Sequence, residues 1–119
     1  MPYAIKKGMD VDYNEVLQRY DRRFKDNQEI VATFLVDINS KKYVKNLRSN
    51  NVDEKELLKI IKSAILPFSN NTVKSLIIET NEWNIVFVSA SDTQNDHLYI
   101  VVARRRLALG ALLSIVKNV

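Results

Sequence analysis

The spacing of apolar residues along this chain alternates between the helical and the extended period. Near the N-terminus, the apolar side chains form one stripe of an amphipathic helix: Tyr13, Val16, Leu17, Tyr20 and Phe24. Asp12, with Glu15 three positions later, has the spacing of a capping box, and Asp26 with Asn27 marks the end of the helix. We therefore predict this helix within a single domain of residues 11–119, after a flexible lead of residues 1–10.

Five stretches have the pattern of strands. Residues 30–38 (IVATFLVDI) are almost continuously apolar and rich in β-branched side chains, which predicts a strand buried on both faces. After turn residues at 39–41, residues 42–47 (KYVKNL) alternate, which predicts an outer strand in a hairpin with the first. Three further strands are predicted at 72–80, 84–90 and 97–103, of which the first two are joined by a tight turn.

Two more helices are predicted, and both carry more apolar surface than one sheet face needs. The helix that starts at Asn51 or Asp53 and stops before Pro67 has an apolar arc of about 160°, formed by Leu57, Leu58, Ile60, Ile61, Ala64 and Ile65. The last helix, predicted from about Arg104 to Asn118, has an apolar arc of about 200°. Such surplus surface is used either inside the domain or by a partner.

Short connections between strands imply antiparallel neighbours. The order helix, strand, strand, helix, three strands, helix therefore predicts an α+β fold with a five-stranded antiparallel sheet and three helices. A length of 119 residues is typical of one domain.

The composition removes several kinds of chemistry. The chain has no cysteine, and its only glycines are Gly8 and Gly110, so neither a thiolate site nor a glycine-rich phosphate loop can be formed. The only histidine, His97, has no partners for a catalytic triad, and we predict a surface or turn histidine. The loop with Asp92, Asn95 and Asp96 is interpreted as a solvated turn rather than a cation site. We expect no enzymatic activity, cofactor or metal.

The chain has neither a secretory signal nor an apolar run long enough to span a bilayer, so we expect a cytoplasmic protein. Its net charge of +4 is a mild excess that is compatible with an ordinary solvated surface or with acidic partners. Trp83 is either an exposed anchor for a partner or folded back onto the sheet.

Two basic clusters raise the question of nucleic acid. One contains Arg22, Arg23 and Lys25, and the other contains Arg104, Arg105 and Arg106. On a helix the three consecutive arginines point in different directions, about 100° apart, which does not favour one flat phosphate-binding patch. Solvated or ion-paired arginines, docking of an acidic protein, and nucleic-acid binding remain as interpretations, in that order of preference.

Three stretches resemble the Roadblock / dynein light chain family over nearly the whole chain. They are ATFLVDINSK, which is similar to the family's first hairpin, the strand trio VKSLIIET, NIVFVSA and HLYIVVA, and the ending LALGALLSIVKNV with its Leu109-Gly110 pair. The chain departs from the family at Asn39-Ser40-Lys41, where the family has an Asp-Gly turn. In this resemblance the last helix crosses the sheet beside the first, with Gly110, Ala111 and Ser114 at a close approach and its apolar arc mostly used internally.

The resemblance implies a small non-enzymatic domain that forms dimers and serves as a platform for small Ras-like GTPases. The first and last helices would cover one face of the sheet, and the middle helix (53–66) would pack beside its copy on the other. The third strands (73–80) would pair edge to edge into one ten-stranded sheet. The implied interface residues are Leu57, Leu58, Ile60, Ile61, Ala64, Ile65, Val73, Ser75 and Ile77.

From this resemblance we expect a homodimeric scaffold that binds and regulates a small Ras-like GTPase. Activation of GTP hydrolysis is one form that this regulation would take. Because an arginine supplied in trans can accelerate phosphoryl transfer, Arg22, Arg23, Arg48 and Arg104 to Arg106 are candidates for such a role. The alternatives are a structural subunit of a larger complex and a basic nucleic-acid-binding domain, of which the second is the less favoured.

Overall fold

The computed structural model describes residues 12–24, 26–68, 73–90 and 97–116. Its strands are β1 (Ile30–Asp37), β2 (Tyr43–Leu47), β3 (Ser75–Glu79), β4 (Trp83–Ser89) and β5 (His97–Arg104). They form one sheet in the order β2-β1-β5-β4-β3, and every neighbouring pair is antiparallel. The two most apolar strands, β1 and β5, are adjacent and buried on both faces, as the near-continuous apolar pattern of β1 predicts.

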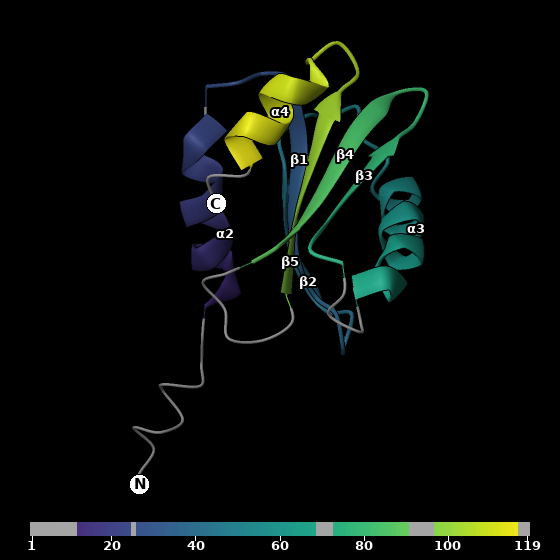
Figure 1. Cartoon of the computed structure of the whole chain (residues 1–119). Coiled ribbons are helices and arrows are strands. Elements are labelled where there is room, and N and C mark those ends of the chain that lie inside the picture. The colour runs from purple at the N-terminus through teal and green to yellow at the C-terminus, as the bar shows by residue number, and fades with distance from the viewer. Residues whose placement is uncertain (1–11, 25, 69–72, 91–96, 117–119) are drawn as a thin grey trace, which may run out of the picture.

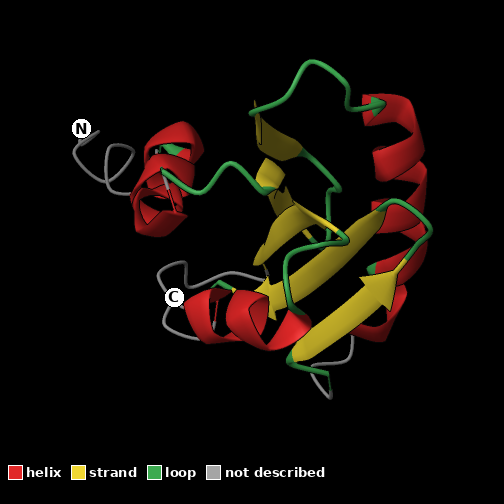
Figure 2. Ribbon diagram, turned by 90° about the horizontal axis from the view of Figure 1, so that it is seen from above, coloured by secondary structure: helices red, strands yellow, loops and turns green. Residues whose placement is uncertain are grey.

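Helices cover both faces of this sheet. The helices α2 (Tyr13–Asp21) and α4 (Leu109–Val116) lie on one face, and α3 (Glu54–Ala64) lies on the other (Figures 1 and 2). Two apolar cores result, because alternate side chains of the central strands point to opposite faces. Phe34 and Phe87 pack under α3, whereas Leu35 and Val86 pack under α2 and α4. The predicted α+β class and the arrangement of the helices are confirmed.

The helix starts follow from their capping residues. The Asp12 carboxylate accepts hydrogen bonds from the backbone N–H groups of Asn14 and Glu15, and the Asp53 carboxylate accepts one from Glu56. Short 3₁₀ turns follow the first two helices, at Arg22–Phe24 and Leu66–Phe68.

The hairpin between β1 and β2 has no glycine in its turn, and other contacts hold the turn instead. The Asp37 carboxylate accepts hydrogen bonds from the N–H groups of Asn39 and Ser40, and the Lys41 N–H bonds to the Asp37 carbonyl. Lys41 has a φ of 62°, the left-handed conformation that glycine adopts most readily. The turn is therefore held by Asp37, at the cost of a strained lysine.

The prediction for the last helix was wrong in two respects. Arg104 continues β5 opposite Trp83, and its N–H bonds to the Glu29 carbonyl, so the helix starts only at Leu109. Of the side chains described in this helix, only Leu112 and Val116 are buried. Leu109 and Leu113 are partly buried against the same core, whereas Ala108 and Ala111 are exposed, so the described part of the apolar arc is largely but not wholly used inside the domain. Gly110 is exposed, with no atom near the position of a Cβ, and marks no close approach.

No helix in the described part of the chain is long and apolar enough to cross a bilayer.

Candidate interaction surface

Strand β3 lies at one edge of the sheet with β4 as its only strand neighbour among the described residues. The Thr80 N–H bonds to the Trp83 carbonyl, and the Ser89 N–H bonds to the Lys74 carbonyl. In an antiparallel ladder every second residue bonds to a given neighbour, so the even-numbered residues of β3 face β4. The backbone groups of Ser75, Ile77 and Glu79 therefore point away from the sheet and form an open edge.

The side chains of β3 alternate between the two faces of the sheet. Leu76 and Ile78 pack against the core under α3. Ile77 points to the opposite face and is 37% exposed. Three of the predicted interface residues lie in or next to β3. Ser75 and Ile77 belong to the open edge, and Val73 lies just before β3 and packs partly against the core.

The apolar arc of α3 is divided between the sheet and solvent. The side chains that point into the core are Leu57, Ile61, Ala64 and Ile65. Leu58 and Ile60 are half-buried, one on each flank of this stripe. A partner can therefore reach the flanks of α3, and the residues in the centre of the arc are already occupied by this chain's own sheet.

An open hollow lies between the Ile60 flank of α3 and the edge strand β3. Its apolar lining includes Ile60, Pro67, Leu76 and Ile78, and its volume is about 490 Å³. Leu66, which starts the 3₁₀ turn two residues after the end of α3, is 75% exposed, the most exposed of the large apolar side chains described. Leu66, Leu76 and Ile78 were not among the predicted interface residues.

The arginines at the end of β5 do not lie on a helix, so the argument from helical spacing does not apply to them. The Arg105 guanidinium donates to the Thr80 carbonyl, 2.6 Å away, and lies 3.7 Å from the Glu79 carboxylate. The Arg106 guanidinium donates to the Glu29 carboxylate at 2.7 Å, which lowers the pKa of Glu29 and raises that of Arg106. Two of the three arginines are therefore ion-paired at the surface.

Trp83 is half-buried and packs against the core under α3. Of the two interpretations of this residue, the structure favours the one in which it folds back onto the sheet.

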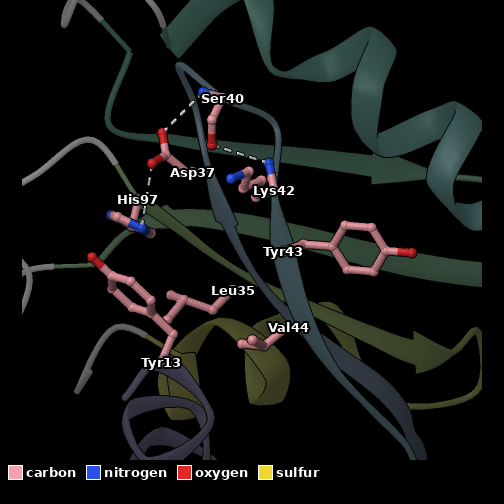
Figure 3. A pocket seen from close by; sticks show the side chains of 8 residues that line it. All are labelled: Tyr13, Leu35, Asp37, Ser40, Lys42, Tyr43, Val44 and His97. Atoms are coloured by element: carbon pink, nitrogen blue, oxygen red, sulfur yellow. Dashed lines mark hydrogen bonds and ion pairs between the residues drawn. The ribbon is translucent and has the colours of Figure 1, made fainter. Parts of the chain in front are cut away.

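His97 is buried, not a surface or turn residue as predicted. It starts a central strand, and the Tyr13 ring of α2 stacks on it at a centroid distance of 4.6 Å. Its Nε2 lies 3.8 Å from an Asp37 carboxylate oxygen, too far for a direct hydrogen bond (Figure 3). Burial raises the pKa of Asp37, but the N–H groups of Ser40 and Asn39 and the nearby His97 outweigh it, so the net shift is downward.

A buried carboxylate that the sequence pattern did not indicate connects α2 with three strands. Asp21 accepts hydrogen bonds from Tyr99 Oη at 2.6 Å, Thr33 Oγ1 at 2.8 Å and Asn46 Nδ2 at 3.0 Å. Burial and the Asp21 charge raise the pKa of Tyr99 far above its usual value, so the phenol stays a donor. The donors offset the unfavourable position of a carboxylate at a helix C-terminus.

The predicted loop cluster of Asp92, Asn95 and Asp96 lies outside the described residues. Within the described residues, no group of three His, Asp or Glu side chains is placed to hold a metal ion.

A five-stranded antiparallel sheet in this order, with two helices on one face and one on the other, is the Roadblock-type α+β fold. Solved structures share it. MglB of Myxococcus xanthus has a TM-score of 0.65 with this chain at 16% identity, over 91% of this chain and 90% of MglB. MglC of Myxococcus xanthus has a TM-score of 0.50 at 10% identity, over 76% of this chain and 80% of MglC. No protein-family model and no curated protein matches the sequence. At these identities the similarity is one of fold.

Proposed function

We propose that this chain is a non-enzymatic, homodimeric scaffold of the Roadblock type that binds a small Ras-like GTPase and regulates its nucleotide cycle. The observation that carries the proposal is an open, apolar β3 edge beside the hollow of α3. It occurs in a fold that matches MglB over most of both chains. The family resemblance supplies the partner class, and the geometry supplies the surface.

The open edge of β3 is compatible with one symmetric pairing. A two-fold axis at Ile77 would place Ile77 opposite its copy and Ser75 opposite the Glu79 of the second chain, each pair exchanging both backbone hydrogen bonds. Leu76 would then lie opposite the second chain's Ile78, on the α3 face of the sheet. Antiparallel pairing of this kind would join the two sheets and add apolar contacts between them.

The helix α3 would contribute its Ile60 flank to the same interface. Ile60 and Leu76 line one hollow, so a second α3 beside the first would cover apolar surface that the single chain leaves half-exposed. Leu57 and Ile61 are each 1% exposed and would not be freed for the partner.

The dimer is tested by sedimentation with a pair of matched proline variants. Ile77→Pro removes an outward N–H from β3 without removing a bond to β4, and we expect it to sediment as a folded monomer. Leu47→Pro is the control, because Leu47 is equally exposed, at 38%, and its N–H also points outward, but from the β2 edge. A monomeric wild-type chain, or loss of the dimer in both variants, would contradict the proposed interface.

The GTPase is tested in two steps. Immobilised chain should retain a Ras-like GTPase from an extract in a manner that depends on whether GDP or a non-hydrolysable GTP analogue is present. The purified GTPase should then change its rate of GTP hydrolysis or nucleotide release when the chain is added in excess. Retention without any change in either rate would leave a scaffold without regulation, and no retention would contradict the GTPase proposal.

If the chain accelerates hydrolysis through an arginine, the surface contacts identify the better candidates. Arg105 and Arg106 are engaged by carboxylates, whereas Arg22 and Arg23 are exposed beside the end of α2. Arg22→Ala and Arg23→Ala should then reduce hydrolysis more than Arg106→Ala does, with binding unchanged.

A further inference from the structure

The second edge of the sheet, β2, is as open as β3 but has different chemistry. The Asp37 N–H bonds to the Lys42 carbonyl, and the Arg48 N–H bonds to the Val31 carbonyl, so the even-numbered residues of β2 face β1. The backbone groups of Tyr43, Lys45 and Leu47 therefore point outward. Among the described residues β1 is the only strand beside β2.

This edge is basic and is unsuited to pairing with its own copy. Residues 41–48 (KKYVKNLR) carry four basic side chains and no acidic one. Symmetric pairing of two β2 strands about Lys45 would place two lysines directly opposite one another, which is destabilising. Lysines on an edge commonly protect it from aggregation, so the charge alone does not indicate a ligand.

Two hollows along the seam between β2 and α2 supply the independent observation. The first, at the start of β2, is lined mainly by Tyr13, Leu35 and Val44, with Asp37, Lys42 and His97 at its polar side (Figure 3). Its volume of about 140 Å³ is several times the space that one water needs. Figure 3 shows the Val44 side chain on the same side as Tyr13 and the Tyr43 side chain pointing the other way. This hollow fits an apolar side chain.

The second hollow lies at the other end of the same seam. It is lined by Gln18 and Arg22 from α2 and the following turn, by Asn46 and Arg48 from β2 and the residue after it, and by Asp21. Both carboxylate oxygens of Asp21 accept hydrogen bonds from Thr33, Asn46 or Tyr99, so they are already engaged within the protein. The Asn46 amide donates to Asp21, and the Arg48 guanidinium donates to the Asn27 carbonyl and lies over the Phe24 ring. Arg22 and Gln18 line the same hollow of about 300 Å³, where two guanidinium groups outweigh one carboxylate in charge, so the hollow fits a carboxylate side chain.

We propose that the seam between α2 and β2 binds an extended segment of another protein as a sixth, antiparallel strand. Its backbone would bond to Tyr43, Lys45 and Leu47, and its alternate side chains would enter the two hollows. In the antiparallel direction the residue opposite Asn46 comes first and the residue opposite Val44 comes two positions later. The recognised pattern is therefore an acidic residue, any residue, and an apolar residue.

The experiment uses the full chain and the labelled peptide Ac-STETLTS-NH2, with its affinity measured by fluorescence anisotropy. The charge-reversed peptide Ac-STKTLTS-NH2 should bind roughly tenfold more weakly or not at all, because the arginines then face a lysine. Amide signals of Tyr43, Lys45 and Leu47 should shift on binding in NMR spectra, and those of Ser75, Ile77 and Glu79 should not.

Two matched pairs of chain variants locate the site. Lys45→Pro removes an outward N–H and the ion pair with Glu54, whereas Lys45→Thr removes only the ion pair. We expect the proline variant to lose at least roughly tenfold in affinity and the threonine variant to change little. Arg22→Glu should weaken binding by a similar factor, whereas Arg23→Glu, with the same change of charge one residue away from the hollow, should not.

The outcomes decide between occupants. Equal binding of both peptides, or shifts at the β3 edge, would overturn the site. Concentration-dependent association of the chain that Lys45→Pro abolishes would assign the β2 edge to a second copy instead. No detectable binding of either peptide would overturn the recognised pattern. None of these readouts depends on the proposed dimer or GTPase, since Ile77→Pro should bind the peptide as the wild type does.

Discussion

Asp21 is the residue on which the position of α2 depends most directly. It is buried, and its partners come from β1, β2 and β5, so one carboxylate connects the helix to three strands. Hydrogen bonds to an ionised acceptor are stronger than neutral ones, and they leave unsatisfied donors when the acceptor is lost.

Asp21→Asn should therefore destabilise the fold although it preserves the shape of the side chain. The amide replaces one acceptor oxygen by an N–H₂ group, which then confronts a donor. We expect a loss of roughly 2 kcal/mol in the free energy of unfolding, measured by urea denaturation. Asp26→Asn, at an exposed position of the same segment, should stay within about 0.5 kcal/mol of the wild type. Equal effects of the two changes would mean that the buried bonds contribute nothing net.

Asp37 should make a measurable contribution to the dependence of stability on pH. Its folded-state pKa is lowered from an ordinary value of 3.8, so its stabilisation is complete above that value and is lost as the pH falls below it. Asp37→Asn keeps an acceptor for the turn N–H groups but cannot titrate. Its free energy of unfolding should fall less steeply than that of the wild type on acidification below about pH 4. Parallel curves would contradict the lowered pKa.

Residues such as these mark the limit of what the pattern of the chain can predict. Asp12 and Asp53 were recognisable as helix caps because their partners lie two or three positions away. Asp21 bonds to residues 12, 25 and 78 positions distant, so no local spacing reveals it. His97 was misassigned for the same reason, because Tyr13 and Asp37 approach it only in the folded chain.

Helices and strands were predictable from the sequence wherever the apolar residues followed one clear spacing, helical or extended. The strand centres and the first two helices lie where the apolar spacing placed them, since burial selects that spacing. The last helix began five residues later than predicted, at Leu109 rather than Arg104, because the arginines extend β5 and then turn. The apolar spacing also did not predict which apolar side chains of α3 pack on the sheet and which reach solvent. A wide apolar arc does not indicate which part of it faces which neighbour.

That division leads to a prediction for two adjacent residues of α3. Ile60→Asp places a charge at the half-buried flank, and we expect a folded monomer. Ile61→Asp places it in the core and should cost roughly 4 kcal/mol or more, enough to unfold much of the chain. Circular dichroism and sedimentation distinguish the two results, with Lys55→Asp on the exposed face as a folded, dimeric control.

If the Ile60→Asp variant were still dimeric, α3 would not contribute to the interface. The test with Ile77→Pro would then decide whether β3 alone forms the interface.

For the whole molecule, the two edges of the sheet have opposite tendencies. The β3 edge, Ser75–Glu79 (SLIIE), is apolar and would pair with itself, whereas residues 41–48 at the β2 edge are basic and would repel their copy. In a dimer joined through β3, the two β2 edges would lie at the outer ends of ten strands, roughly 43 Å apart at the usual strand spacing. One dimer would then present two separate peptide sites.

A tandem peptide tests this geometry as a whole. Two copies of STETLTS joined by a flexible Gly/Ser linker of roughly 60 residues can span that separation. Binding at the first site raises the local concentration at the second, so the tandem peptide should bind the wild-type dimer roughly 10²-fold more tightly than the single peptide. On the monomeric Ile77→Pro variant, which has one site, the gain should shrink to about the twofold that two identical motifs allow statistically. A linker of only about 10 residues is too short to reach the second site and should reduce the gain on the wild type to the same factor of about two. Equal gains on both proteins with the long linker would contradict two sites in one dimer.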